Sequence, residues 1–173
     1  MSGSTPAPTK VGLVVTLAAT GVAIAVFVAE RSATVTPGFA APFLWIFSFL
    51  FLVRVVGQLV VRLRRPAWLP PTDEWNLSPY LLLLPAQIGI LALMALIDIS
   101  FSLGRGAPVH PHPRFGDGVL AFAYLYAGVM AVRYAVRMRR RPAERWFGGT
   151  IPMVFHFVLA AYLYVFGWFH ASH

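Results

Sequence analysis

Arg54 is a charged residue inside an apolar stretch, residues 42–63, that is long enough to cross a membrane. Ionisable groups at such a depth are rare and costly, and most of them serve a function. Gln58 and Arg62 follow at intervals of four residues, so the three polar side chains share one face of a helix. A guanidinium in this setting can bind a phosphate, another anion or a carbonyl oxygen. We therefore place the first candidate binding site at Arg54 and Gln58.

Three residues on other apolar stretches, Gln87, Tyr134 and His156, should lie at a depth similar to that of Arg54. If the helices turn these side chains inward, they form one ligand- or lipid-binding cluster with Arg54 and Gln58. No acidic residue is expected at this depth. The partner of Arg54 would then be a lipid phosphate, a bound anion, a quinone oxygen or another subunit. The structural alternative is that the glutamines and the arginine only hydrogen-bond between helices.

His156 is the one histidine expected inside the membrane. An imidazole can ligate the metal of a haem or a pigment, so Arg54 and His156 together are compatible with a haem, quinone or pigment cofactor. A second axial histidine is missing, because the other histidines are expected on the opposite side; this argues against a self-contained cytochrome b. The alternative is a histidine that hydrogen-bonds to a neighbouring helix.

The remaining histidines fall near the other membrane surface. His110 and His112 lie in the tract PVHPHPRFGD, and His170 and His173 end the chain. Neutral imidazoles brought together suit zinc, nickel or copper, so these four residues are candidate metal ligands; two loosely ordered segments are the alternative.

Asp98 lies toward the same surface as these histidines. It could carry protons or cations. The expectation that we favour is that it pairs with Arg31 or Arg105, because the distance to the surface is short.

The elements that position these residues follow from composition. Of the 173 residues, 58% are hydrophobic and 12% are charged, about half the charge of a soluble domain. We predict an all-α integral membrane protein in which residues 1–10 are flexible and residues 11–173 form one domain. Apolar stretches of this length are typical of helices, since barrel strands would be half as long and would alternate. The five predicted spans are 11–29, 42–63, 79–101, 118–136 and 151–169.

The distribution of basic residues predicts the orientation, because Lys and Arg are retained on the cytoplasmic side. Three basic residues, Arg31, Arg105 and Arg114, fall on one side of the predicted spans. The opposite side holds Lys10, Arg62, Arg64, Arg65, Arg137, Arg139, Arg140, Arg141 and Arg145. This bias places the N-terminus in the cytoplasm and the C-terminus on the outer, periplasmic side. The net charge of +8 is then explained by topology and anionic lipid headgroups, not by nucleic acid.

Sequence motifs of soluble enzymes are absent. There is no G-x-S-x-G, P-loop or H-E-x-x-H, and only six residues are acidic. The segments RVVGQLVV, LPPTDEW and RRPAERWFGGTIPMVFHFVLA resemble segments of uncharacterised bacterial multi-pass proteins, a resemblance that implies no activity. We expect a multi-pass protein of the bacterial cytoplasmic membrane.

Three functions fit these patterns. The favoured one is a non-catalytic subunit or scaffold of a larger membrane complex, in contact with lipids and with other membrane subunits through the polar cluster. The first alternative is a quinone-, haem- or lipid-binding component of an electron-transfer or lipid-modifying assembly. The second is a small transporter or metal-cation permease, although a positive inner half without a carboxylate is a poor path for a cation.

Overall fold

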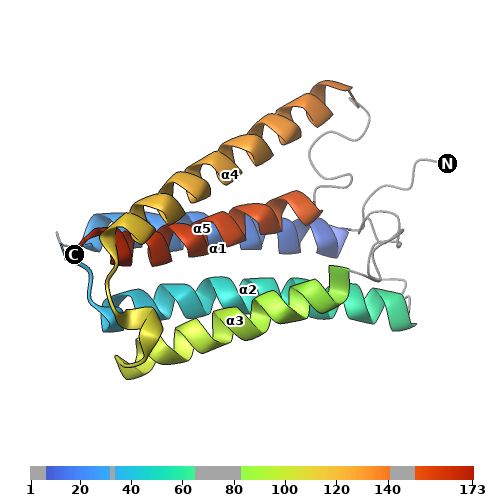
Figure 1. Ribbon diagram of the computed structural model, residues 1–173. Helices are drawn as coiled ribbons and strands as arrows, with labels where there is room; N and C mark the ends of the chain where they lie inside the picture. Colours follow the sequence, from blue (N-terminus) through green and yellow to red (C-terminus); the bar gives the residue numbers. More distant parts are fainter. Residues whose placement is uncertain (1–6, 32–33, 65–82, 141–150) are drawn as a thin grey trace.

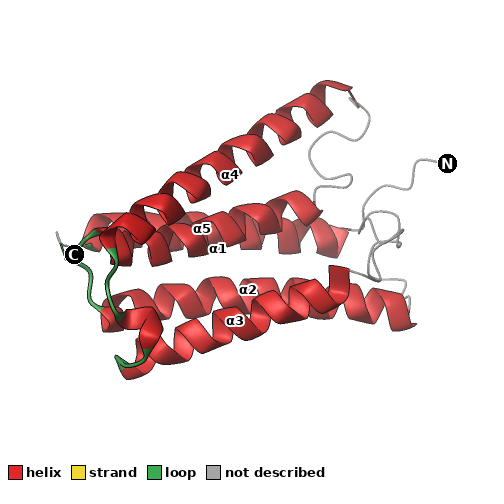
Figure 2. Ribbon diagram, viewed as in Figure 1, coloured by secondary structure: helices red, strands yellow, loops and turns green. Residues whose placement is uncertain are grey.

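The computed structural model describes residues 7–31, 34–64, 83–140 and 151–173, and all of their secondary structure is helical (Figures 1 and 2). Each of five α-helices is long and apolar enough to cross a membrane. This confirms the predicted all-helical class and the five candidate spans. The elements are α1 (Ala7–Glu30), α2 (Pro37–Arg64), α3 (Leu83–Leu103), the short 3-10 turn η3 (Ala107–Val109), α4 (Pro113–Arg140) and α5 (Ile151–Ala171).

Helix α2 begins five residues before the predicted boundary at Pro42. The side chain of Thr36 accepts a hydrogen bond from the amide of Phe39 at 3.3 Å, and the carbonyl of Thr36 accepts one from Ala40. Thr36 is therefore the N-cap, and Pro37 occupies the first helical position, where a missing N–H costs nothing. Pro42 lies within the helix instead of starting it.

Helix α4 also begins five residues early, at Pro113 rather than at Gly118. The carbonyl of His112 accepts a hydrogen bond from the amide of Gly116 at 2.8 Å, which closes the first helical turn. The predicted start of the fourth span at Gly118 was therefore five residues too late. The ring of a proline fixes its φ angle at a helical value, which favours proline at the first position of a helix. The last proline of the tract, Pro113, therefore begins α4.

Helix α5 is the central element. It packs against α1, α2 and α4 (Figure 1). Helix α3 packs against α2, and the ring of its Phe101 also meets that of Phe169 on α5, with the centres 4.7 Å apart. Of the apolar part of α5, 61% is buried within the molecule, against 6% for α4. Figure 1 shows that α4 meets α5 near the C-terminus of α5 and then diverges from it. The core is largely aromatic, and its fully buried members include Phe27, Leu44, Phe47, Phe101 and Phe169.

The two ends of the bundle differ in chemistry. We call the end at which α2 and α4 finish, near Arg64 and Arg140, the arginine end. The opposite end, at which α5 finishes and α4 begins, carries His110, His112 and His170, and we call it the histidine end. Helix α5 begins at Ile151, where the fifth span was predicted to start, whereas the predicted start of the third span at Pro79 lies outside the described residues.

Candidate functional site

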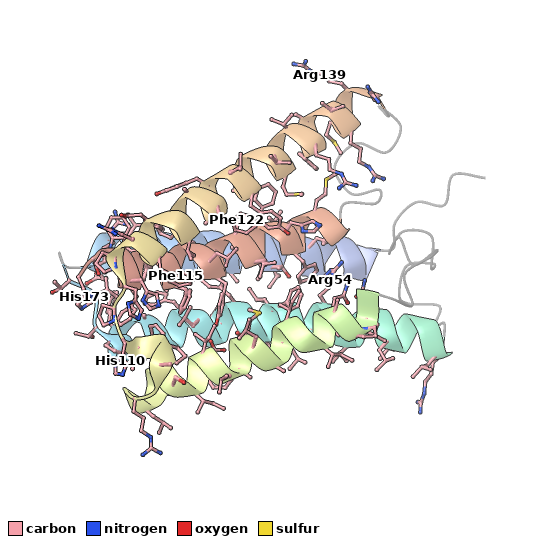
Figure 3. All side chains as sticks on the ribbon, viewed as in Figure 1. Arg54, His110, Phe115, Phe122, Arg139 and His173 are labelled. Atoms are coloured by element: carbon pink, nitrogen blue, oxygen red, sulfur yellow. The ribbon has the colours of Figure 1, made fainter. Side chains whose placement is uncertain are left out.

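Arg54 is buried between α2 and α5, toward the arginine end (Figure 3). Its side chain is 9% exposed, and the Nε atom has no hydrogen-bond partner. The guanidinium carbon lies 5.6 Å from the centre of the Phe155 ring on α5, a distance at which a cation interacts with the face of an aromatic ring. Within the described residues, no carboxylate pairs with Arg54. The ring contact offsets only part of the cost of burying this charge.

A tyrosine–histidine pair joins α4 to α5 beside Arg54. The hydroxyl of Tyr126 and the Nδ1 atom of His156 are hydrogen-bonded, and the two rings meet edge to face with their centres 5.6 Å apart. Arg54 is close enough to interact electrostatically with both side chains, and Arg133 with His156. Three helices thus contribute to one polar group, which we call the Arg54 cluster: Arg54, Tyr126, Phe155 and His156.

The chemistry available to the Arg54 cluster is that of binding. A guanidinium with a free N–H donor recognises an oxygen anion, and the adjoining hydroxyl and imidazole can orient a second oxygen. No described carboxylate is present to act as a general base or to hold a hard metal ion. The cluster is therefore suited to binding an anionic or carbonyl-bearing group.

The structure brings together only some of the five residues predicted to converge. Arg54 and His156 lie in one group, and Gln58 is buried one turn along α2. Gln87 on α3 has a buried side-chain oxygen without a hydrogen-bond partner, and Tyr134 on α4 is half-buried. Neither Gln87 nor Tyr134 forms a hydrogen bond to the Arg54 cluster in the described part of the chain. Their part in a common site stays a prediction.

His170 occupies the core of the histidine end. It is 2% exposed, and neither ring nitrogen has a hydrogen-bond partner of normal geometry. His112 stacks on it with the ring centres 6.3 Å apart and the planes 14° from parallel. The rings of Phe115, Phe166 and Phe169 surround it edge to face.

The four histidines proposed as metal ligands are only partly gathered. His112 and His170 are neighbours, whereas His110 is exposed and His173 lies against the backbone carbonyl of Phe169 at 2.9 Å. Within the described residues, no three His, Cys, Asp or Glu side chains come together as a metal-ligand set. Aromatic rings pack around His170 in the core, and a metal site at these histidines stays a prediction.

Asp98 was expected to pair with Arg31 or Arg105, and this prediction was wrong. Asp98 is fully buried and accepts a hydrogen bond from the hydroxyl of Tyr162 at 3.1 Å. Arg31 instead lies over the ring of Trp168, 3.6 Å from its centre, and donates a hydrogen bond to the hydroxyl of Tyr164. Arg105 is exposed. The rotation of α3 places Asp98 in the core, where the hydroxyls of Tyr162 and Ser48 face it.

Sequence reasoning missed Tyr126 and Phe155 in the Arg54 cluster, and Tyr162 as the partner of Asp98. Tyr126 precedes Arg133 by two helical turns, so a search along the face of α4 could have found it. Phe155 and Tyr162 look like ordinary core aromatics in the sequence, and only the packing of α5 assigns their roles.

Comparisons with known proteins do not assign the chain to a family. No family model matches the chain, and neither curated proteins nor solved structures contain a match. Functional inference therefore rests on the geometry.

Proposed function

We propose that this chain is a multi-pass membrane protein whose Arg54 cluster binds the anionic headgroup of a membrane lipid, and that it serves as a non-catalytic component of a larger membrane assembly. The observation that carries the proposal is the burial of Arg54 without a carboxylate partner among the described residues. A buried charge is strongly destabilising unless it is paired, so a bound phosphate would supply what the described chain lacks.

The position of the cluster supports a lipid as the ligand. Arg54 lies six residues, or about 9 Å along the helix, before Val60, where the apolar part of α2 ends. This depth is within reach of a headgroup that enters from the arginine end. Arg133 and Arg137 lie on α4, the helix that diverges from α5 toward that end (Figure 1), and add positive charge along such an entry path.

A quinone is the second candidate ligand, and the Tyr126–His156 pair favours it. Carbonyl oxygens of a quinone accept hydrogen bonds from hydroxyl, imidazole and guanidinium groups, and aromatic side chains such as Phe155 can contact its ring. Haem is less well supported. All four other histidines belong to the histidine end, so none of them can supply a second axial ligand beside His156.

Replacement of Arg54 by leucine tests the proposal. We expect the purified wild-type protein to retain an anionic phospholipid after extensive washing in detergent, and Arg54→Leu to retain at least tenfold less. The factor follows from the loss of a charge-assisted hydrogen bond, which contributes about 1.5–3 kcal/mol. Mass spectrometry of the extracted lipids measures the amount bound per protein.

Arg64→Leu is the matched control for this experiment, because Arg64 is an exposed arginine on the same helix. It should leave the bound lipid unchanged. Equal lipid retention in Arg54→Leu and the wild type would contradict the proposal. Retention of a quinone in place of a phospholipid would show that the Arg54 cluster binds the carbonyl oxygens of a quinone. A protein free of both that co-purifies with another subunit would make that subunit the partner of Arg54.

We further propose that the arginine end faces the cytoplasm of a bacterial cell, with the N-terminus inside and the C-terminus in the periplasm. The bias of Lys and Arg toward this end supports the orientation. The chain has no cysteine, so single cysteines can be introduced and labelled without background. In intact cells, a membrane-impermeant maleimide should label His110→Cys and leave Arg139→Cys unlabelled until the membrane is opened. The reverse pattern would invert the topology.

A further inference from the structure

Asp98 lies in the interior of the bundle between three helices. It is 0% exposed, and it comes from α3. Tyr162 on α5 donates a hydrogen bond to its Oδ1 atom at 3.1 Å and also approaches the carbonyl of Met94 at 3.3 Å. The hydroxyl of Ser48 on α2 faces the same carboxyl group. One acidic group is thus enclosed by hydroxyls from the two helices next to it.

The described surroundings of Asp98 contain no positive charge. No arginine or histidine of the described residues pairs with it, and Arg31, the nearest candidate in the sequence analysis, is bound to Tyr164 and Trp168. An ionised carboxylate with one neutral hydrogen bond and no solvent contact is very costly to bury. This cost disappears if the carboxyl group is protonated and therefore neutral.

The unsatisfied atoms around Asp98 indicate where that proton would lie. The Oδ2 atom of Asp98 and the Oγ atom of Ser48 are both buried without a hydrogen-bond partner of normal geometry. A proton on Oδ2 would turn this atom into a donor toward Ser48, while Oδ1 still accepts from Tyr162. Both oxygens of the carboxyl group would then be satisfied.

We propose that Asp98, with Ser48 and Tyr162, forms a buried proton-binding site in the half of the membrane nearer the histidine end. The bound proton makes Asp98 a neutral acid that links α2, α3 and α5. The site is separate from the Arg54 cluster: Ser48 precedes Arg54 by six residues, about 9 Å along α2. The inference does not depend on lipid binding.

Infrared spectroscopy at neutral pH tests this site directly. A protonated carboxyl group has a carbonyl stretching band above the amide region, whereas a carboxylate does not. The chain has only six acidic residues, and a maltoside detergent has no ester carbonyl to overlap the band. Ester carbonyls of a retained phospholipid absorb in the same region but are common to both proteins, so we expect the difference spectrum, wild type minus Asp98→Asn, to show one carboxylic acid band. Asp117→Asn is the matched control, because Asp117 is exposed on α4, and it should keep the band.

A second variant keeps the test valid if Asp98→Asn does not fold. Tyr162→Phe removes the donor to Oδ1 and should shift the carbonyl band to a higher frequency without abolishing it. Absence of the band from the wild type, or its persistence in Asp98→Asn, would overturn the proposal. A band that appears only after sodium and potassium are removed would also overturn it, since the group would then be a carboxylate holding a metal cation.

Discussion

Gly116→Ala is expected to detach the histidine end of α4 from α5 and to destabilise the protein by about 1–3 kcal/mol, the usual cost of an overpacked contact. A Cβ atom at this position would overlap the backbone nitrogen of Ala171 and lie 2.7 Å from the carbonyl carbon of His170. Backbone atoms cannot move aside as a flexible side chain can. The two helices would have to separate at the point where they approach most closely.

The effect should be large because α4 depends on this contact. In the described structure, α4 packs chiefly against α5 and diverges from it beyond the histidine end (Figure 1). Thermal unfolding in detergent measures the loss. Gly118→Ala is the control: a Cβ atom there meets nothing within 4 Å, and alanine favours the helix over glycine by roughly 0.5–1 kcal/mol. Gly116→Ala with unchanged stability would show that the helices are not in contact at this glycine.

Phe27→Ala is expected to loosen α1 from the bundle and to cost about 3–5 kcal/mol, as for other buried phenylalanines. The side chain is 0% exposed. Its ring contacts the rings of Phe39 and Phe43 on α2, with centres 5.6 and 5.2 Å away, and that of Tyr164 on α5 at 6.0 Å. Between helices in lipid, such packing replaces the hydrophobic effect as the main stabilising interaction. Its loss leaves a cavity where three helices meet.

Denaturation in mixed micelles gives the difference in free energy of unfolding for this variant. The control is Phe49→Ala, which removes an identical ring from α2 where 62% of it is exposed. Only a small change is expected there, because an outward ring has few protein contacts to lose. Equal effects at the two positions would mean that the aromatic contacts of Phe27 do not hold α1 in place.

The spans were predictable because length and hydropathy alone select a helix that can cross a membrane. All five predicted stretches correspond to helices, although the starts of α2 and α4 were placed too late. Both errors arose at prolines. Pro37 and Pro113 lie before the predicted spans, whereas a proline is favoured at the first position of a helix, and both helices begin at these prolines.

The candidate site was predictable in part. Arg54 and His156 were identified because an ionisable residue in an apolar stretch stands out without any knowledge of packing. Their partners were not identified. Tyr126 and Phe155 have nothing unusual in their sequence context, and Asp98 was expected to pair with an arginine, whereas it is fully buried and accepts a hydrogen bond from Tyr162.

The sequence by itself determined the all-helical class, the number of apolar helices and which ionisable residues lie within them. These properties depend only on composition and on distance along the chain. Only the tertiary structure decided which of these groups meet. In an α-helix, a rotation of 100° per residue separates neighbours in the sequence onto different faces, and packing alone chooses the face that turns inward. This choice placed Arg54 against Phe155 and gave Asp98 the hydroxyl of Tyr162 in place of an arginine.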